Sequence, residues 1–586
     1  MKQFFTTLLA SCLGFIVAIL LLTGIFALTI SSVVSSAGEE ETVDVKENSV
    51  LYITLNHGVV DHAVSDGLPF GGAASVGLDD ILKSLKNAAT DDDIKGIFME
   101  INGMSMGMAS CEELRNALLE FKKSKKFIIA YSDYYTQGAY YLSSVADQVY
   151  VNPSGGVEFK GIAANLIFIK GVLEKIGVEP QIIRHGKFKS AIEPLINDKM
   201  SPANREQTRS YIGALWNQII IGVSNSRKIG PAELQNIADS LLTLDAKGAV
   251  KYKLADGIKY KDEILEILKE KSGAKAIDKI NFVSLTKYLK IDVKEENRDL
   301  HNKVAVIFAE GDIVDGKGDD GNIGSTTLSR RIRDARLDAD IKAVVLRINS
   351  PGGSALASDV IWREVVLTRK VKPVIVSMGD VAASGGYYIA CAADTIVAQP
   401  NTITGSIGVF GVLWNAKGLI DKLGVSTDTV KFGKYSDLGT ASRAMTEGER
   451  NIVQQEIENI YDQFITHVAE GRKLTKAEVD SIGQGRVWSG IDAKAKGLVD
   501  VLGGLQTAID IAIKKAKLEK YSVVYLPHPE KGLSKFMKEL SGEGDDKVQM
   551  VIKNELGADY KYYQYLHKAR NIRGIQARLP YMLELN

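Results

Sequence analysis

The sequence contains the same stretch twice, 247 residues apart. DDDIKGIFMEIN at 91–102 matches DADIKAVVLRIN at 338–349, and GAYYLSSVADQVYVNP at 138–153 matches GGYYIACAADTIVAQP at 385–400. One register holds through all of these matches without a gap, which indicates a duplication and not a chance likeness. The chain must therefore fold as two copies of one structural unit, and each copy serves as a control for the other.

Each copy alternates short β-branched runs with longer helical stretches. KAVVLRIN and KPVIVSMG are typical of strands, whereas SALASDVIWREVVLTRK and TEGERNIVQQEIENIYDQFITHVAEGRKL are typical of helices. This alternation predicts an α/β fold with mostly parallel strands. The 586 residues are too many for one core. We place one unit at 47–290 and the other at 302–525, with a charged boundary at 291–303 and a tail of unassigned role at 526–586.

The N-terminal stretch from residue 4 to residue 34 carries no charged side chain. A membrane-spanning helix needs about 20 apolar residues, whereas the apolar core of a signal peptide has about 7–15. We therefore expect residues 1–38 to hold an uncleaved, single-pass anchor, although the small residues at 35–38 would also suit cleavage. Lys2 precedes the stretch and acidic residues follow it, which predicts a cytoplasmic N-terminus. In a bacterium, the part of the chain after residue 38 would then face the periplasm from the inner membrane.

The charge balance and the metal-binding residue types exclude several function classes. Lys and Arg number 72, as do Asp and Glu, so no basic surface for nucleic acid is indicated. The seven histidines lack metal-ligand spacing, and the three cysteines form neither a disulfide framework nor a metal motif. We therefore expect no metal and no organic cofactor.

The two copies differ at one serine and one lysine. Ser384 lies among alanines and glycines in DVAASGGYY, and the other copy has Gln137 at the matching position. Lys189 of HGKFKSAIE matches Ser436 in the second copy. A serine needed only to shape the turn would leave a small residue in both copies. Each copy therefore lacks a polar group that the other retains, which indicates one shared site.

A serine and a lysine can form a catalytic pair without histidine. The Ser384 hydroxyl becomes a nucleophile when a base takes its proton, and Lys189 can be that base if burial lowers its pKa. An oxyanion hole would complete the site. Gly352 and Gly353 follow a proline and can expose backbone N–H groups, and Gly385 lies at a predicted helix start where such groups are free.

These features together resemble the signal peptide peptidase A family, in its long, tandem-repeat bacterial type. The anchor, the two units and the motifs SPGGS, AASGGYY, TGSIGVFG and GKFKSAIEP carry the resemblance. It implies two crotonase-like units, as in the Clp protease, with Ser384 as nucleophile and Lys189 as general base. It also implies that Ser406 in TGSIG orients the lysine and that the enzyme is a membrane-attached homotetramer. Its substrates would be signal-peptide remnants and other hydrophobic peptides.

Alternatives stay open at this point for the base and for the function. Lys187 lies two residues from Lys189, but its counterpart Lys434 is retained in the second copy, which favours a structural role for both. A crotonase-like acyl-transfer enzyme would share the α/β unit but rarely needs an anchor and a serine nucleophile. A non-catalytic membrane scaffold would explain the duplication but not the reciprocal losses.

Overall fold

The computed structural model describes residues 45–55, 58–63, 75–291, 299–319, 321–527 and 574–579, together with residues 555–556 and scattered positions before residue 25. Among these residues, no helix is both long and apolar enough to cross a lipid bilayer. The predicted anchor at 4–34 lies, apart from the scattered positions, outside the described residues.

The first unit is built on a parallel sheet with the strand order β8-β6-β5-β4-β1-β9. Successive side chains of β4 point to opposite faces, so Ile97 packs against α2 and α3 while Phe98 packs against α10. Helices thus cover both faces, as is usual for parallel sheets. The bounds are β1 (Ser49–Ile53), β4 (Ile94–Glu100), β5 (Phe127–Ser132), β6 (Gln148–Val151), β8 (Gly257–Ile258), β9 (Phe282–Ser284), α2 (Leu78–Thr90), α3 (Met108–Lys122) and α10 (Lys261–Ser272).

The second unit repeats this plan in the strand order β19-β17-β15-β13-β10-β21, in which only β19 is antiparallel to its neighbour among the described strands; β16 pairs with β15, and β20 pairs with β16. Val344 of β13 packs against α12 and α13, and Val345 packs against α19 on the other face. KAVVLRIN and KPVIVSMG fall in β13 and β15, which confirms the α/β prediction. The bounds are β10 (Lys303–Glu310), β13 (Ile341–Ser350), β15 (Val374–Ala383), β16 (Thr395–Ala398), β17 (Ile403–Gly405), β19 (Val487–Ser489), β20 (Val501–Leu502), β21 (Ser522–Leu526), α12 (Ser325–Leu337), α13 (Ala355–Arg369) and α19 (Leu505–Ala516).

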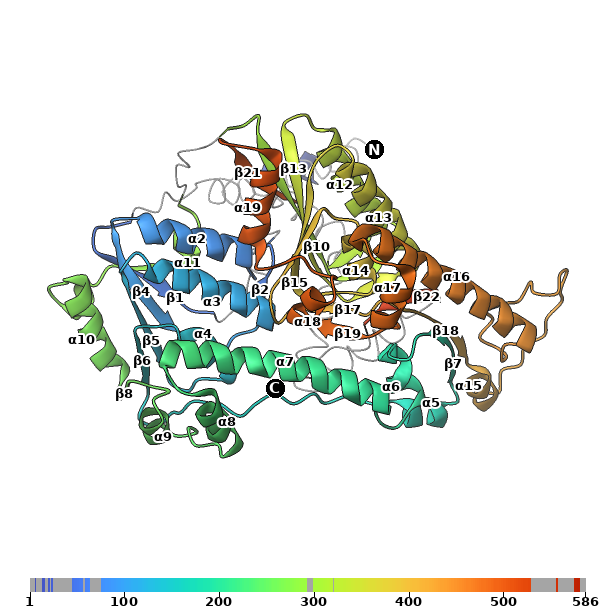
Figure 1. Ribbon diagram of the computed structural model, residues 1–586, viewed down its shortest axis with the longest axis horizontal. Helices are drawn as coiled ribbons and strands as arrows, with labels where there is room; N and C mark the ends of the chain where they lie inside the picture. Colours follow the sequence, from blue (N-terminus) through green and yellow to red (C-terminus); the bar gives the residue numbers. More distant parts are fainter. Residues whose placement is uncertain are drawn as a thin grey trace.

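A third sheet joins strands from both units and from the C-terminal tail. Its order is β12-β11-β14-β22-β18-β7. Strand β7 belongs to the first unit by sequence but pairs antiparallel with β18 of the second unit. Strand β22 comes from the tail and pairs with β14 and β18 (Figure 1). The bounds are β7 (Glu179–His185), β11 (Asp312–Val314), β12 (Asn322–Gly324), β14 (Gly352–Ser354), β18 (Val409–Asn415) and β22 (Gly574–Arg578).

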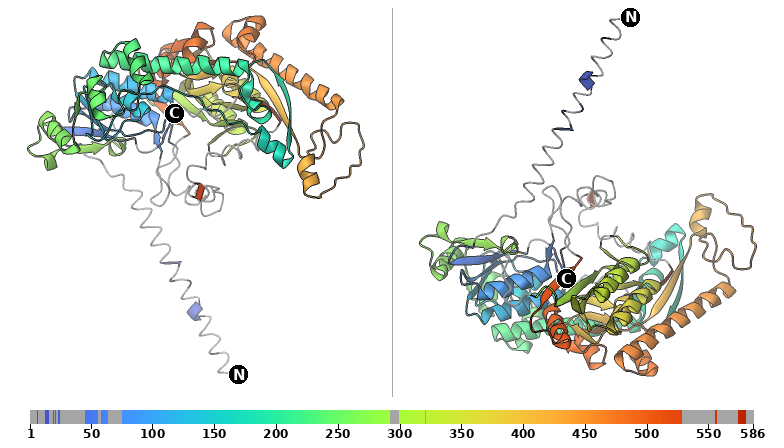
Figure 2. Two further views of the ribbon diagram at one scale, coloured as in Figure 1. Left: turned by 90° about the horizontal axis from the view of Figure 1, so that it is seen from below. Right: turned by 90° about the horizontal axis from the view of Figure 1, so that it is seen from above.

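Two helices of 26 residues each show the duplication most plainly: α7 (Pro202–Arg227) and α16 (Glu447–Arg472). The side chain of the N-cap residue, Ser201 or Thr446, accepts a hydrogen bond from a backbone N–H of the first turn in each helix. Helix α7 runs along both units in Figure 1, and its Tyr211 packs against the strands β17 and β19. In Figure 2, α15 (Lys417–Lys422) and the loop after it extend away from the body beside α16.

Buried polar contacts hold the two main sheets together. The Asp380 carboxylate in β15 accepts hydrogen bonds from the N–H groups of Ala109 and Ser110 at the start of α3, and from the Ser110 hydroxyl at 2.6 Å. A negative charge is favourable at the N-terminus of a helix. Arg347 of β13 lies nearby, fully buried, and pairs with Asp61 at 2.7 Å and Glu113 at 2.6 Å. The orientation of the two units therefore depends on a few charged groups.

We expect Asp380→Ala to lower the free energy of unfolding by about 1–3 kcal/mol, because it leaves the N–H groups at the start of α3 without their acceptor. Urea denaturation followed by circular dichroism measures the effect. The matched control is Asp133→Ala. Asp133 is the counterpart of Asp380 in the first copy, but it is exposed. An equal effect of both substitutions would contradict this account of the junction.

Candidate active site

Ser384 lies between β15 and α14 (Gly385–Ala390), where it forms the N-cap of the helix. Its backbone has φ +55° and ψ −113°, an unfavourable conformation for a residue with a side chain. The two residues that follow have no room for a side chain. A Cβ on Gly385 would lie 2.6 Å from Ser358 Oγ, and one on Gly386 would lie 2.7 Å from the Ser350 carbonyl oxygen. The small residues in AASGGYY therefore let a strained turn present the hydroxyl at a helix start.

Lys189 reaches this hydroxyl from the first unit. It follows β7 and precedes a short 3₁₀ turn, Ser190–Ile192. Its Nζ lies 2.8 Å from Ser384 Oγ, although the two residues are 195 positions apart in the chain. The same nitrogen lies 3.0 Å from Ser406 Oγ and 3.1 Å from the Ser406 carbonyl oxygen. The structure thus brings together the three polar side chains that the sequence singled out.

The surroundings of Lys189 favour the neutral amine. Lys189, Ser384 and Ser406 are all fully buried. Loss of solvation lowers the pKa of the Lys189 ammonium well below its ordinary value, because burial penalises the charged form. Lys187 and Lys434 are exposed, and each places its amine over the ring of the next residue along the chain. The structure therefore brings Lys189, and neither rival lysine, to the serine.

The two glycines of SPGGS, Gly352 and Gly353, lie beside the same site but differ in how they contribute to it. We expected both Gly352 and Gly353 to present free N–H groups. The Gly352 N–H is not free, because it donates to Ser350 Oγ at 3.2 Å. Gly352 contributes its conformation instead, with φ +98°, and a Cβ there would lie 2.7 Å from the Gly385 nitrogen. Gly353 pairs with Ala577 in the third sheet, and Gly385 begins α14; these two glycines stay the candidate oxyanion donors.

Two residues that the sequence did not single out hold Lys189 in place. Gln207 of α7 is fully buried and donates to the Phe188 carbonyl oxygen at 3.1 Å and to Ser190 Oγ at 2.7 Å. These two residues flank Lys189. Gly485 packs against the backbone of Lys189, where a Cβ would lie 2.6 Å from the Lys189 Cα. The two glycines of GQG at 483–485 could have indicated close packing from the sequence alone. The sequence around Gln207, in contrast, does not distinguish it from a solvent-exposed residue of a helix.

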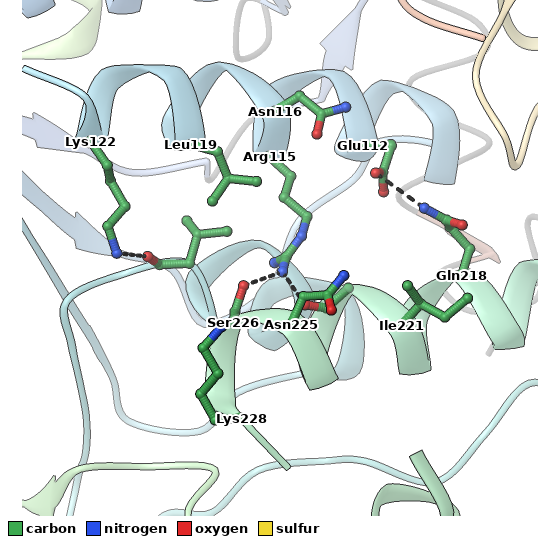
Figure 3. Close-up of a pocket in the computed structure, with 12 residues that line it drawn as sticks. Glu112, Arg115, Asn116, Leu119, Lys122, Gln218, Ile221, Asn225, Ser226 and Lys228 are labelled. Atoms are coloured by element: carbon green, nitrogen blue, oxygen red, sulfur yellow. Dashed lines mark hydrogen bonds between the residues drawn. The ribbon is translucent and has the colours of Figure 1, made fainter. Parts of the chain in front are cut away.

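A pocket of about 380 Å³ lies elsewhere, between α3 and α7 of the first unit (Figure 3). Its central side chain, Arg115, donates to Ser144 Oγ at 2.7 Å, to the Gly222 carbonyl oxygen at 2.6 Å and to Ser226 Oγ at 2.6 Å. These bonds tie α3 to α7 and to the end of α4 (Gln137–Ser143). The pocket is thus a seam between helices, and its lining residues do not include those of the serine site.

A mixed α/β fold that presents a serine hydroxyl at a helix start defines a serine hydrolase as the class of protein. The model of Peptidase family S49 matches residues 120–275 and 367–519, once in each unit. The chain belongs to this family and is a serine peptidase. Membership in a peptidase family decides against the acyl-transfer enzyme and the non-catalytic scaffold.

The similarity to known proteins extends over most of the chain. Protease 4 of Salmonella typhi is 39% identical over 472 residues, which cover 79% of this chain and 76% of that protein. Serine protease SPPA, chloroplastic, of Arabidopsis thaliana is 34% identical over 550 residues, covering 91% and 78%. A solved structure of a ClpP1 mutant from Listeria monocytogenes aligns with 35% of this chain and 94% of its own, with 16% identity and a TM-score of 0.24.

We expect Gly485→Ala to lower kcat/KM on a hydrophobic peptide by about tenfold or more, because the added methyl group displaces Lys189 and small displacements of a catalytic group are costly. Steady-state kinetics measures this. Gly497→Ala is the matched control: Gly497 also has a positive φ, +74°, but a Cβ there meets nothing closer than 3.9 Å. An equal loss in both variants would assign the effect to backbone strain alone.

Proposed function

We propose that this serine peptidase works by a Ser–Lys dyad, with Ser384 as nucleophile and Lys189 as general base. The 2.8 Å contact between Lys189 Nζ and Ser384 Oγ at a fully buried position carries this proposal. A general base must lie within hydrogen-bond reach of the proton that it removes, and its pKa is best placed near the working pH. Burial lowers the pKa of the Lys189 ammonium well below its ordinary value, which is the direction that the second requirement demands.

In the first half of the reaction, the neutral Lys189 amine takes the hydroxyl proton as Ser384 Oγ bonds to the carbonyl carbon of the substrate. The N–H groups of Gly353 and Gly385 stabilise the negative charge that develops on the carbonyl oxygen. Ser406 accepts hydrogen bonds from the lysine through its hydroxyl and its carbonyl oxygen, and so orients the amine toward Ser384. Lys189 then returns the proton to the departing amine.

In the second half, a water molecule replaces the departed amine. Lys189 removes a proton from this water as it attacks the ester on Ser384. The bond between the acyl carbon and Ser384 Oγ then breaks, Lys189 returns the proton to Ser384 Oγ, and the new carboxyl end leaves. The same two side chains therefore serve both halves of the reaction, and no metal or organic cofactor takes part in this scheme.

We further propose extended hydrophobic peptides, signal-peptide remnants among them, as the substrate class. Two strands, β14 and β18, flank the serine and can pair with a peptide backbone on either side, a common mode of peptide recognition. A compact folded protein has its backbone groups already paired and does not fit between them. The crotonase-like fold of each unit remains part of this proposal, supported by the repeated parallel sheets.

The proposed setting is the inner membrane, with the peptidase facing the periplasm as a homotetramer. The uncharged stretch at 4–34 supports a single-pass anchor. The loop after α15 exposes large apolar side chains, with Phe432 99% and Val430 85% exposed. Large apolar side chains that are this exposed are typical of protein–protein contacts, and here they support contacts with other copies of the chain.

Ser384→Ala and Lys189→Ala should each lower kcat by about 10³-fold or more without unfolding the protein, because dyad members act as one unit. Lys189→Arg should fail as well, since a guanidinium stays protonated. Hydrolysis of a synthetic signal-peptide core measures the loss. A serine-directed organophosphorus probe, read by mass spectrometry, should label Ser384 in the wild type.

Lys187→Ala and Lys434→Ala are the matched controls and should retain activity, because both lysines are exposed. A probe adduct on another serine would overturn the assignment of the nucleophile. Full turnover by Lys189→Ala would overturn the assignment of the base.

Activity should fall as the pH is lowered through the depressed pKa of Lys189, because protonation removes the only lone pair that can accept the serine proton. Below that pKa, log kcat/KM should decrease by about one unit per pH unit. A pH–rate profile measures this, with circular dichroism at each pH to show that the chain stays folded. A rate that stays constant down to the pH of unfolding would contradict a lysine base.

A further inference from the structure

Arg486 contacts one aromatic ring from each unit beside the candidate active site. It follows Gly485 and directly precedes β19. Its guanidinium carbon lies 4.7 Å from the ring centre of Phe188 and 4.5 Å from that of Trp488. Phe188 belongs to the first unit and precedes Lys189, whereas Trp488 belongs to β19 of the second unit. A planar guanidinium binds well to aromatic faces, so the arginine joins the lysine loop to the second unit.

The backbone of Arg486 holds the other polar partner of the lysine amine. Its carbonyl oxygen accepts a hydrogen bond from the Ser406 N–H at 2.7 Å. Ser406 is fully buried and has φ +50°, an unfavourable conformation for a residue with a side chain. Such a conformation persists only where the surrounding structure holds it. Arg486 thus holds Ser406 through its backbone and Phe188 through its side chain.

Most of the attachment of the arginine side chain comes from the aromatic rings and little from the neighbouring carboxylate. Arg486 Nη1 lies 2.9 Å from Oε1 of Glu206 in α7. The Glu206 side chain is 55% exposed, and an ion pair this open to solvent contributes little to stability. The contact with Phe188 therefore depends mainly on the flat shape of the guanidinium.

The first copy has no arginine at the equivalent position. Asp245 and Ser489 cap equivalent short helices in the two copies, and each accepts a hydrogen bond from a backbone N–H of the first turn. Three residues before these caps are Leu242 in the first copy and Arg486 in the second. Leu242 packs against the apolar core of its own unit. The arginine therefore occurs only in the copy whose segment contacts the lysine loop.

We propose that Arg486 is a positioning residue: it fixes the loop that carries Lys189 at hydrogen-bond distance from Ser384. This inference rests on the dyad proposed above. Loss of the guanidinium releases Phe188, and Lys189 moves with it because the two residues are adjacent in the chain. A small displacement of a catalytic group slows the reaction strongly. A looser loop also admits water to the amine, which raises the pKa of Lys189 back toward its ordinary value.

Steady-state kinetics of Arg486→Met on a synthetic hydrophobic peptide tests this role. We expect kcat to fall about tenfold or more and KM to stay within about twofold, because the substitution disturbs the dyad and leaves the flanking strands in place. The acid limb of the pH–rate profile should move to higher pH, since the pKa of Lys189 rises. Arg486→Lys should behave in the same way, because an ammonium group has no planar face.

Arg443→Met is the matched control. The Arg443 side chain is 29% exposed, compared with 22% for Arg486, and it pairs with Glu449 at 2.6 Å. Its loss should leave kcat, KM and the acid limb unchanged. An Arg486→Met protein that loses thermal stability but keeps the wild-type kcat and acid limb would overturn the proposal. A higher KM at constant kcat would overturn it too, because it would assign Arg486 to substrate binding.

Phe188→Leu tests the same contact from the first unit and serves also if Arg486→Met does not fold. It should lower kcat and shift the acid limb in the same direction. Two residues that act through one contact are not additive, so the double variant should be no slower than the slower single variant. A double variant whose loss equals the product of the two single losses would contradict positioning through Phe188.

Lys189→Ala, assayed beside these variants, separates this inference from the function on which it rests. An inactive Lys189→Ala protein together with a fully active Arg486→Met protein would overturn the positioning role and leave the dyad in place. Full turnover by Lys189→Ala would overturn both.

Discussion

The burial of one lysine amine against one serine hydroxyl is the interaction on which the rest of the structure depends. A charged ammonium is costly to bury, so a fully enclosed Lys189 is most stable as the neutral amine. Ser384 and Ser406 supply polar partners that satisfy it there. Neither unit can create this environment alone, because the lysine and the two serines come from different copies. The junction between the units therefore supplies the surroundings that the proposed base needs.

The duplication explains how this division of roles became available. In the first copy, strand β7 leads the chain into the second unit, where it pairs with β18 and delivers Lys189. The matching region of the second copy is an exposed loop that carries Lys434 and Ser436. In the second copy, the helix start after β15 carries Ser384, whereas the first copy places Gln137 there. The proposed dyad needs each group once, which accounts for each copy keeping a different one.

In the proposed mode of substrate binding, the third sheet supplies the strand edges with which a peptide would pair. Open strand edges are liable to pair with any extended chain, and proteins generally cover them. A peptidase that binds its substrate between β14 and β18 must leave these two edges accessible to it. Strand β22 of the tail covers both edges. A substrate that bound in the proposed way would therefore have to replace β22.

The sequence by itself determined the repeat, the α/β class, the helix start at Ser384 and the residues in which the copies differ, because each of these is a pattern read over neighbouring positions or one constant spacing. Only the tertiary structure decided that the Gly352 N–H donates to Ser350 Oγ. It also decided that Gln207 donates to the Phe188 carbonyl oxygen, next to Lys189. It also decided that the tail returns to the site as β22. Each of these three features depends on contacts between residues that are far apart in the chain. Hydrogen-bond partners and strand order of this kind cannot be predicted from the local sequence.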